Sequence, residues 1–223
     1  MRKLLGYALL ASLAISPQYA NSSIRDARTS ANSRLEQITE RDANSYMLNA
    51  RRNIESNDFH GAIGNLQRSF DVYDRSAGAA NLNSVSYLLI LGESYLEILS
   101  RLDKNSNMYG GVVEAVDKSF HLARATLNDF VKDSPERKFD TDTKAYYARV
   151  WSDLTNFYQA TNHFERAFYS SIAWLHFEQS PEILKKLVDI ASKVPKDVLE
   201  SNWHMLFSIL GAEETELLFK QMK

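Results

Sequence analysis

The side chains of this chain that are able to do chemistry are five histidines, many serines and scattered carboxylates. A helical metal site needs ligands at a short fixed spacing, as in HExxH. The histidines instead occur singly, in different segments: His60, His121, His163, His176 and His204. No GxSxG turn accompanies any serine. We therefore predict no enzyme activity and no metal, and surface positions for the turn histidines His60 and His163.

Two further segments match ligand-binding loops only in part. Gly110 and Gly111 lie at a predicted helix start, but the Lys-Ser/Thr pair of a phosphate loop does not follow. Asp140 and Asp142 lack the additional oxygen ligands and the closing Glu of an EF-hand. We expect the glycines to end a loop, and Asp140 or Thr141 to cap the next helix. No cofactor is predicted.

Composition narrows the classes of partner. The chain has 26 basic and 28 acidic side chains and no dense basic cluster, which argues against nucleic acid. Cysteine is absent, so there is no disulfide, no thiolate metal site and no lipid attachment of the bacterial lipoprotein kind. Because 44% of the residues are hydrophobic, a packed core is expected.

The first residues have the pattern of a secretory signal peptide. Arg2 and Lys3 precede an apolar run over 4–15, and a helix-breaking Ser-Pro comes before an expected cut after Ala20, with a cut after Ala14 as the alternative. The run is shorter than the roughly 20 residues needed to span a membrane. We predict a signal peptide over 1–20, a periplasmic or secreted protein, and no integral membrane segment after cleavage.

The mature chain divides into a polar arm and a helical domain. Residues 21–41 have few large apolar groups, which predicts an arm that is mobile or ordered by a partner. Over 42–223, apolar residues recur three and four apart between short polar breaks, and no strand alternation is sustained. The domain is predicted to be all-α, with helices over 42–56, 58–75, 83–102, 110–132, 143–160, 163–179, 181–193, 196–209 and 212–221.

Two segments about a hundred residues apart share one spacing of large and small residues. In "YYARVWSDLTNFYQATNHFERAF" a face of large residues is followed by a polar break and an early alanine, as in "YMLNARRNIESNDFHGAIGNLQRSF". This spacing resembles the tetratricopeptide repeat. The positions concerned are Tyr46, Ala50, Phe59 and Ala62 in a first unit; Gly92, Tyr95 and Ala115 in a middle unit interrupted by about eleven residues; and Trp151, Leu154, Tyr158 and Ala167 in a third.

The resemblance implies an α-solenoid of three to four antiparallel helix pairs, in which the first helix of each pair lines a concave groove. An irregular helical bundle is the alternative. The register places these residues in the groove: Asn44, Met47, Arg51 and Ile54; Ser86, Leu89, Glu93 and Leu96; and Arg149, Ser152, Asn156 and Gln159. Aromatic residues that do not all fit a core, such as Tyr146 or Phe168, suggest an exposed patch.

Such a groove implies a protein partner, bound as a peptide, a helix or a subunit of an envelope complex. We expect an exported interaction scaffold that helps assemble or stabilise an envelope-associated machine, such as a pilus, secretion or flagellar system. A structural subunit whose arm orders against a neighbouring copy is the alternative, and an enzyme with dispersed carboxylates or histidines is the third.

Overall fold

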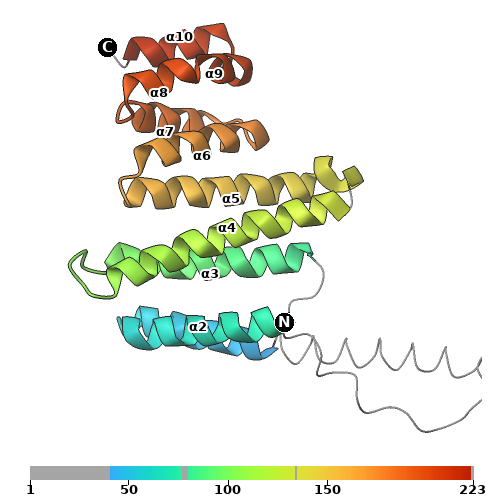
Figure 1. Ribbon diagram of the computed structural model, residues 1–223, viewed down its shortest axis with the longest axis vertical. Helices are drawn as coiled ribbons and strands as arrows, with labels where there is room; N and C mark the ends of the chain where they lie inside the picture. The colour runs from blue at the N-terminus through green and yellow to red at the C-terminus, as the bar shows by residue number, and fades with distance from the viewer. Residues whose placement is uncertain (1–40, 77–79, 134, 222–223) are drawn as a thin grey trace, which may run out of the picture.

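The computed structural model describes residues 41–76, 80–133 and 135–221 (Figure 1). Within these ranges the chain is all-α and contains no strand, as predicted. The predicted signal peptide, 1–20, and residues 21–40 of the predicted arm lie outside them. Arg41 already belongs to the first helix. None of the described helices combines the length and the apolar character that crossing a membrane requires.

The helices follow one another with short connections. A helix over 41–55, which has no label in Figure 1, is followed by α2 (Phe59–Ser76), α3 (Leu82–Arg101), α4 (Tyr109–Asp133), the 3-10 helix η1 (Pro135–Phe139), α5 (Thr141–Ala160), α6 (Phe164–Phe177), α7 (Pro181–Ala191), α8 (Lys196–Ser201), α9 (Trp203–Leu210) and α10 (Ala212–Gln221).

Two helix pairs are closed by the same turn. Asn57 (φ 60°) and Asn162 (φ 61°) both adopt the left-handed conformation just after a helix end. The amide of Asp58 donates to the Asn53 carbonyl at 2.8 Å, and the amide of His163 donates to the Tyr158 carbonyl at 2.8 Å. A second bond, from each asparagine amide to the residue three before it, completes the Schellman pattern, which satisfies the last carbonyls of the first helix.

The small residues after these turns let the paired helices approach closely. Ala62 and Ala167, five residues beyond each left-handed asparagine, are fully buried. In the α3/α4 pair the close approach is at Gly92, where an added Cβ would lie 2.5 Å from Cε1 of Phe120. Ala115, predicted for this role, is only partly buried. The reason is that the ring of Phe120, from the middle of α4, occupies the space beside Gly92.

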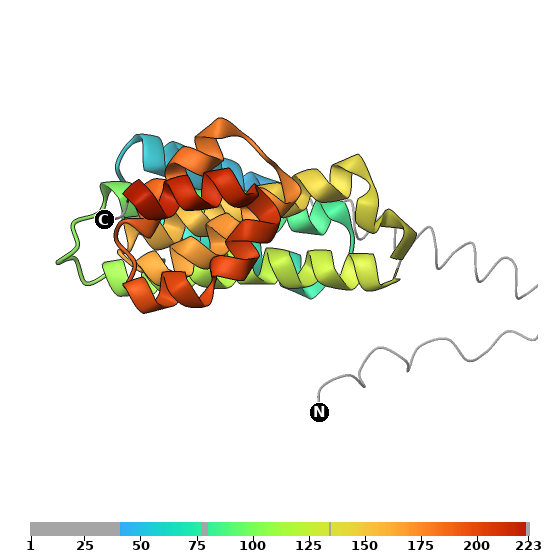
Figure 2. The same ribbon diagram turned by 90° about the horizontal axis from the view of Figure 1, so that it is seen from above.

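The helices are stacked along the longest axis of the molecule, each running back across the one before it (Figures 1 and 2). Packing is most extensive between α3 and α4 and between α5 and α6; α4 also packs on α5, and α6 on α7. One hydrophobic core runs through the stack from Ala50 to Leu206. Each pair therefore buries its open face against the next one.

Aromatic and hydroxyl side chains join successive pairs. The fully buried Ser69 hydroxyl donates to the Ala43 carbonyl at 2.8 Å and lies 2.8 Å from the Tyr87 hydroxyl, so it links helix 41–55, α2 and α3. Farther along, the Tyr147 ring of α5 stacks on Phe177 of α6, and its hydroxyl donates to Asn128 of α4. These contacts join helices of different pairs through specific hydrogen bonds and ring stacking, in addition to apolar packing.

Several predicted boundaries are wrong for local reasons. The helix predicted over 196–209 is broken at Asn202, whose side-chain amide donates to the Val198 carbonyl at 2.7 Å and so competes with the backbone bonds of a continuous helix. Gly110 and Gly111 lie in the first turn of α4 and do not end a loop. Asp140 is the residue before α5, but its side chain makes no capping bond.

Candidate functional site

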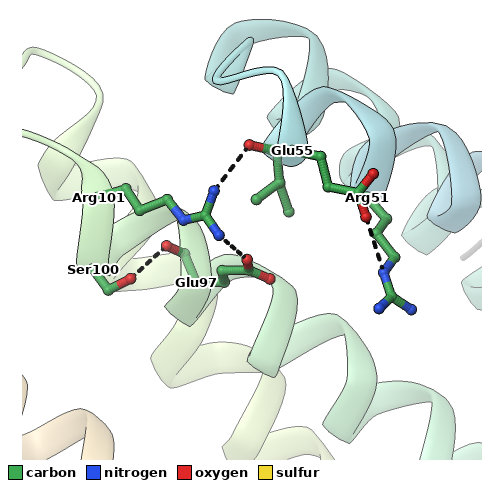
Figure 3. A network of polar contacts seen from close by, with 6 residues as sticks. Arg51, Glu55, Glu97, Ser100 and Arg101 are labelled. Atoms are coloured by element: carbon green, nitrogen blue, oxygen red, sulfur yellow. Dashed lines mark hydrogen bonds and ion pairs between the residues drawn. The ribbon is translucent and has the colours of Figure 1, made fainter.

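Helix 41–55, α3, α5 and α7 alternate along the chain with α2, α4 and α6, and polar contacts join each to the next. We call this set the first-helix layer. At its start, Arg101 of α3 donates from Nη1 to the Ile54 carbonyl at 3.2 Å, near the end of helix 41–55 (Figure 3). Its Nη2 donates to Glu97 Oε1 at 2.5 Å, which holds the guanidinium in place. A single side chain thus bridges two helices far apart in the sequence.

The joint between α3 and α5 is built from three ionisable groups. Arg149 donates from Nη2 and Nε to Glu93 Oε1 at 2.5 and 2.9 Å. Asp153, one turn after Arg149 on α5, has a buried Oδ2 atom that no described residue hydrogen-bonds. The pKa of Asp153 is raised to about 7, first by burial and then by the negative charge of Glu93; Arg149 lowers it, and a hydrogen bond with Glu93 raises it.

Between α5 and α7 the contacts continue through amides. The ammonium of Lys186 donates to Asn156 Oδ1, and Gln159 Nε2 donates to Asp189 Oδ2 at 3.5 Å. Lys186 also lies 5.8 Å from the ring centroid of Trp174, the position of a cation–π contact. Burial lowers its pKa.

A hollow of about 570 Å³ lies along the first half of α5, and we call it the α5 hollow. Its lining is Thr141, Lys144, Ala145, Ala148, Arg149 and Ser152 of α5, with Trp174, Phe177 and Glu178 from the end of α6. The hollow exists because α7 has 11 residues and α5 has 20, and because the described contacts of α7 with α5 begin at Asn156. Figure 1 shows α5 extending past α6 and α7.

The walls of the α5 hollow combine aromatic surface with charge. Trp174 donates from Nε1 to Glu178 Oε2 at 3.1 Å, which fixes the indole at the rim. Ala145 is exposed, and Ala148 is almost fully buried, so the floor is made of small side chains. An apolar side chain can therefore lie against Trp174 and Phe177 with polar groups at the edges, as in many protein interfaces.

The predicted groove residues separate into two groups. Glu93, Arg149, Ser152, Asn156 and Gln159 lie on the α3 and α5 part of the first-helix layer, where they form the joints and the hollow described above. The first-unit residues lie at the far end: Asn44 and Arg51 are exposed, Met47 packs partly on the core, and Arg51 pairs with Glu55 at 3.6 Å. No described hydrogen bond or ion pair joins these two groups.

Four residues expected to be exposed are wholly or partly buried. Ile54 and Leu89, placed in the groove by register, are buried in the core. Phe168 is fully buried, and it is the next residue, Tyr169, that is 42% exposed. Tyr146 is partly buried against the core. Burying an apolar side chain is favourable, so helix register alone does not decide which of these residues are exposed.

Three residues of this region, Asp153, Lys186 and Trp174, were not among the predicted site residues. Asp153 had a detectable signal, because it follows Arg149 by one helical turn on the predicted groove face. The other two depend on how far α7 and α6 extend along α5, which spacing within one helix does not reveal.

A second polar cluster lies between α4 and α5. The Tyr158 hydroxyl donates to Asp117 Oδ1 at 3.1 Å and lies 3.0 Å from His121 Nε2. Burial lowers the pKa of His121, although Asp117 raises it. The guanidinium of Arg166 lies over the Tyr158 ring at 5.7 Å. The aromatic residue of the repeat pattern thus ties α4, α5 and α6 together.

Among the side chains that the structure describes, no group of three or more His, Cys, Asp or Glu is arranged to hold a metal ion. Comparison of the chain with protein-family models, with curated proteins and with solved structures returned no match. The first-helix layer and the α5 hollow are the features of the described chain that point to a function.

Proposed function

We propose that this chain is a tetratricopeptide-like scaffold that binds another protein through its first-helix layer. The observation that carries the proposal is the repeated hairpin: the turns after Asn53 and Tyr158 share the same left-handed asparagine, the same pair of backbone bonds and the same buried alanine. Contacts from each helix pair to the next also suit a repeat architecture, in which one face of the stack is available for binding.

The α5 hollow is the proposed place of contact. A peptide or helix of the partner would lay an apolar side chain against Trp174 and Phe177 and place polar groups toward Lys144 and Glu178. Aromatic residues at the wall of a recess are frequent anchors of protein interfaces. We therefore expect affinity to depend on this half of α5 more than on helix 41–55.

A matched pair of substitutions tests the binding site. Ala145→Arg puts a long cation at an exposed position of the hollow, and Ala125→Arg puts the same side chain at an exposed position of α4 outside it. Partners cross-linked to the tagged chain in envelope fractions are identified, and their affinity for the purified chain is measured. Ala145→Arg should weaken binding by about tenfold or more, while Ala125→Arg leaves it unchanged.

Equal loss in both variants, or loss in neither, would count against the α5 hollow. The thermal unfolding midpoint should stay the same in both, because both alanines are exposed.

We further propose that the scaffold is exported and acts in assembling or stabilising an envelope-associated machine. The support is the signal-like pattern over 1–20. Fractionation of cells that produce the full chain, or a chain lacking 1–20, tests it. Export predicts that the full chain is found outside the cytoplasm in shortened form and that the truncated chain stays inside. Recovery of both in the cytoplasm would end this part of the proposal.

A further inference from the structure

The α3 and α5 joint has one cation for two carboxyl groups. Arg149 is committed to Glu93 through two hydrogen bonds to the same oxygen. Asp153 lies at the same joint with one carboxyl oxygen buried and unmatched by any described donor. This oxygen is buried and faces no described hydrogen-bond donor, a position that is costly for an ionised carboxylate.

We propose that this joint is a proton-dependent latch: it is closed while Asp153 is protonated and loosens when Asp153 is ionised. With a proton on Asp153, the three groups sum to zero charge. Without it, they carry one net negative charge, and Asp153 repels Glu93 across the contact between α3 and α5. The contact lies between the part of the stack before α5 and the part that carries the α5 hollow.

Among the described residues, the charges that act on Asp153 come from two helices. The charged groups acting on Asp153 are Glu93 from α3 and Arg149 from α5 itself. On α4, Asp117 and His121 face Tyr158, Arg124 faces Trp151, and Lys118 faces Phe70. Arg166 of α6 faces the Tyr158 ring, and Lys186 and Asp189 of α7 bind Asn156 and Gln159.

The sign of the pH dependence follows from the direction of the shift. Burial raises the pKa of Asp153 from 3.8 to about 7 in the folded chain. Between these values the folded state binds the proton and the unfolded state does not. The stability from this proton is fully present below about pH 4 and is lost as pH rises through about 7. Loosening is therefore expected in the neutral to mildly alkaline range.

Carboxyl-carbon NMR titration of the full chain gives the first test, with Asp153 assigned by its absence in Asp153→Asn. A midpoint near pH 7 supports the latch, and a midpoint below pH 5 overturns it. Urea unfolding at pH 5 and pH 8.5 is the second test. Asp153→Asn keeps the neutral form, so its urea midpoint should exceed that of the wild type by more at pH 8.5 than at pH 5.

Asp129→Asn is the matched control, because Asp129 is exposed on α4 away from the joint. It should behave as the wild type at both pH values. Hydrogen exchange, corrected for the intrinsic effect of pH, then tests the movement itself. Amides of Arg149 to Phe157 should exchange about tenfold faster at pH 8.5 in the wild type but not in Asp153→Asn. Unchanged exchange, together with a titration near pH 7, would overturn the latch.

Discussion

Gly92 is the position where a single atom decides how two helices pack. The Phe120 ring fills the space that a Cβ would need, with Cε1, Cδ1 and Cζ all within 3.0 Å of its place. The ring is fully buried, so any shift of it would displace other core side chains. Glycine is unfavourable in the middle of a helix, so its presence in α3 is explained by this contact.

Gly92→Ala should therefore destabilise the protein although alanine is the better helix former. The overpacking is expected to lower the free energy of unfolding by about 1–3 kcal/mol, measured by urea denaturation. The double variant Gly92→Ala with Phe120→Leu should lose less than the sum of the two single changes, because the smaller side chain makes room for the new methyl group. A stabilising Gly92→Ala would show that α3 and α4 are farther apart than described.

For single residues, the sequence predicts which side chains are buried better than it predicts which ones face the groove. Ala62, Ala167 and Leu154 are buried as their spacing predicts, because a small or branched residue on the apolar stripe has one place to go. Ile54 and Leu89 are apolar residues that the repeat register assigned to a polar groove, but both side chains are buried in the core. Asp153 was missed because its importance comes from a neighbour on another helix.

The two left-handed turns show how an element is ended and the next begun. After Asn57, the carboxylate of Asp58 accepts a hydrogen bond from the Gly61 amide at 2.9 Å and so caps α2. After Asn162, the corresponding residue is His163, whose side chain makes no capping bond to α6. The backbone geometry is shared, while the cap is present in only one copy.

This difference gives a reciprocal prediction. Asp58→Ala should destabilise the protein by about 1 kcal/mol, because the Gly61 amide loses its acceptor. His163→Asp should stabilise it by about 0.5–1 kcal/mol, because it adds the missing cap to α6 near its positive end. Thermal or urea unfolding near pH 7 measures both. If His163→Asp gave no gain while Asp58→Ala gave a loss, the two turns would not be equivalent.

Element boundaries were predictable where the signal is local. Ser180 accepts a bond from the Ile183 amide before α7, with Pro181 at the first helical position, so this start was read correctly. The end of α8 was not, because Asn202 breaks the helix through its own amide, which also donates to the Tyr169 hydroxyl at 3.2 Å. That second partner belongs to α6 and is invisible in a window of the sequence.

The whole molecule is held together by packing between neighbouring helices, and the C-terminal helices add buried residues to the core. Leu199 and Leu206 of α8 and α9 are buried at the last layer of the core. The described packing of this layer on earlier helices is mainly through α6 and α9. The last layer therefore adds its own buried surface and its contacts with α6 to the stability of the whole.

A chain ending after Lys193, and so lacking α8 to α10, should stay helical and unfold in one transition. Its urea m-value should fall roughly in proportion to the surface removed, and its midpoint should fall as well. Circular dichroism during urea titration gives both quantities. Complete loss of helix in the shortened chain would mean that the terminal layer is required for the fold of the others.

The three connections within the first pairs, 56–58, 102–108 and 161–163, all lie at one edge of the stack (Figure 1). The middle one is longer than the other two, yet α3 and α4 pack extensively. That edge already accommodates extra residues without disturbing the helices beneath it. A fluorescent reporter or an affinity tag can therefore be inserted between Asp103 and Ser106. Such an insertion leaves the opposite ends of the helices and the recess along α5 unchanged.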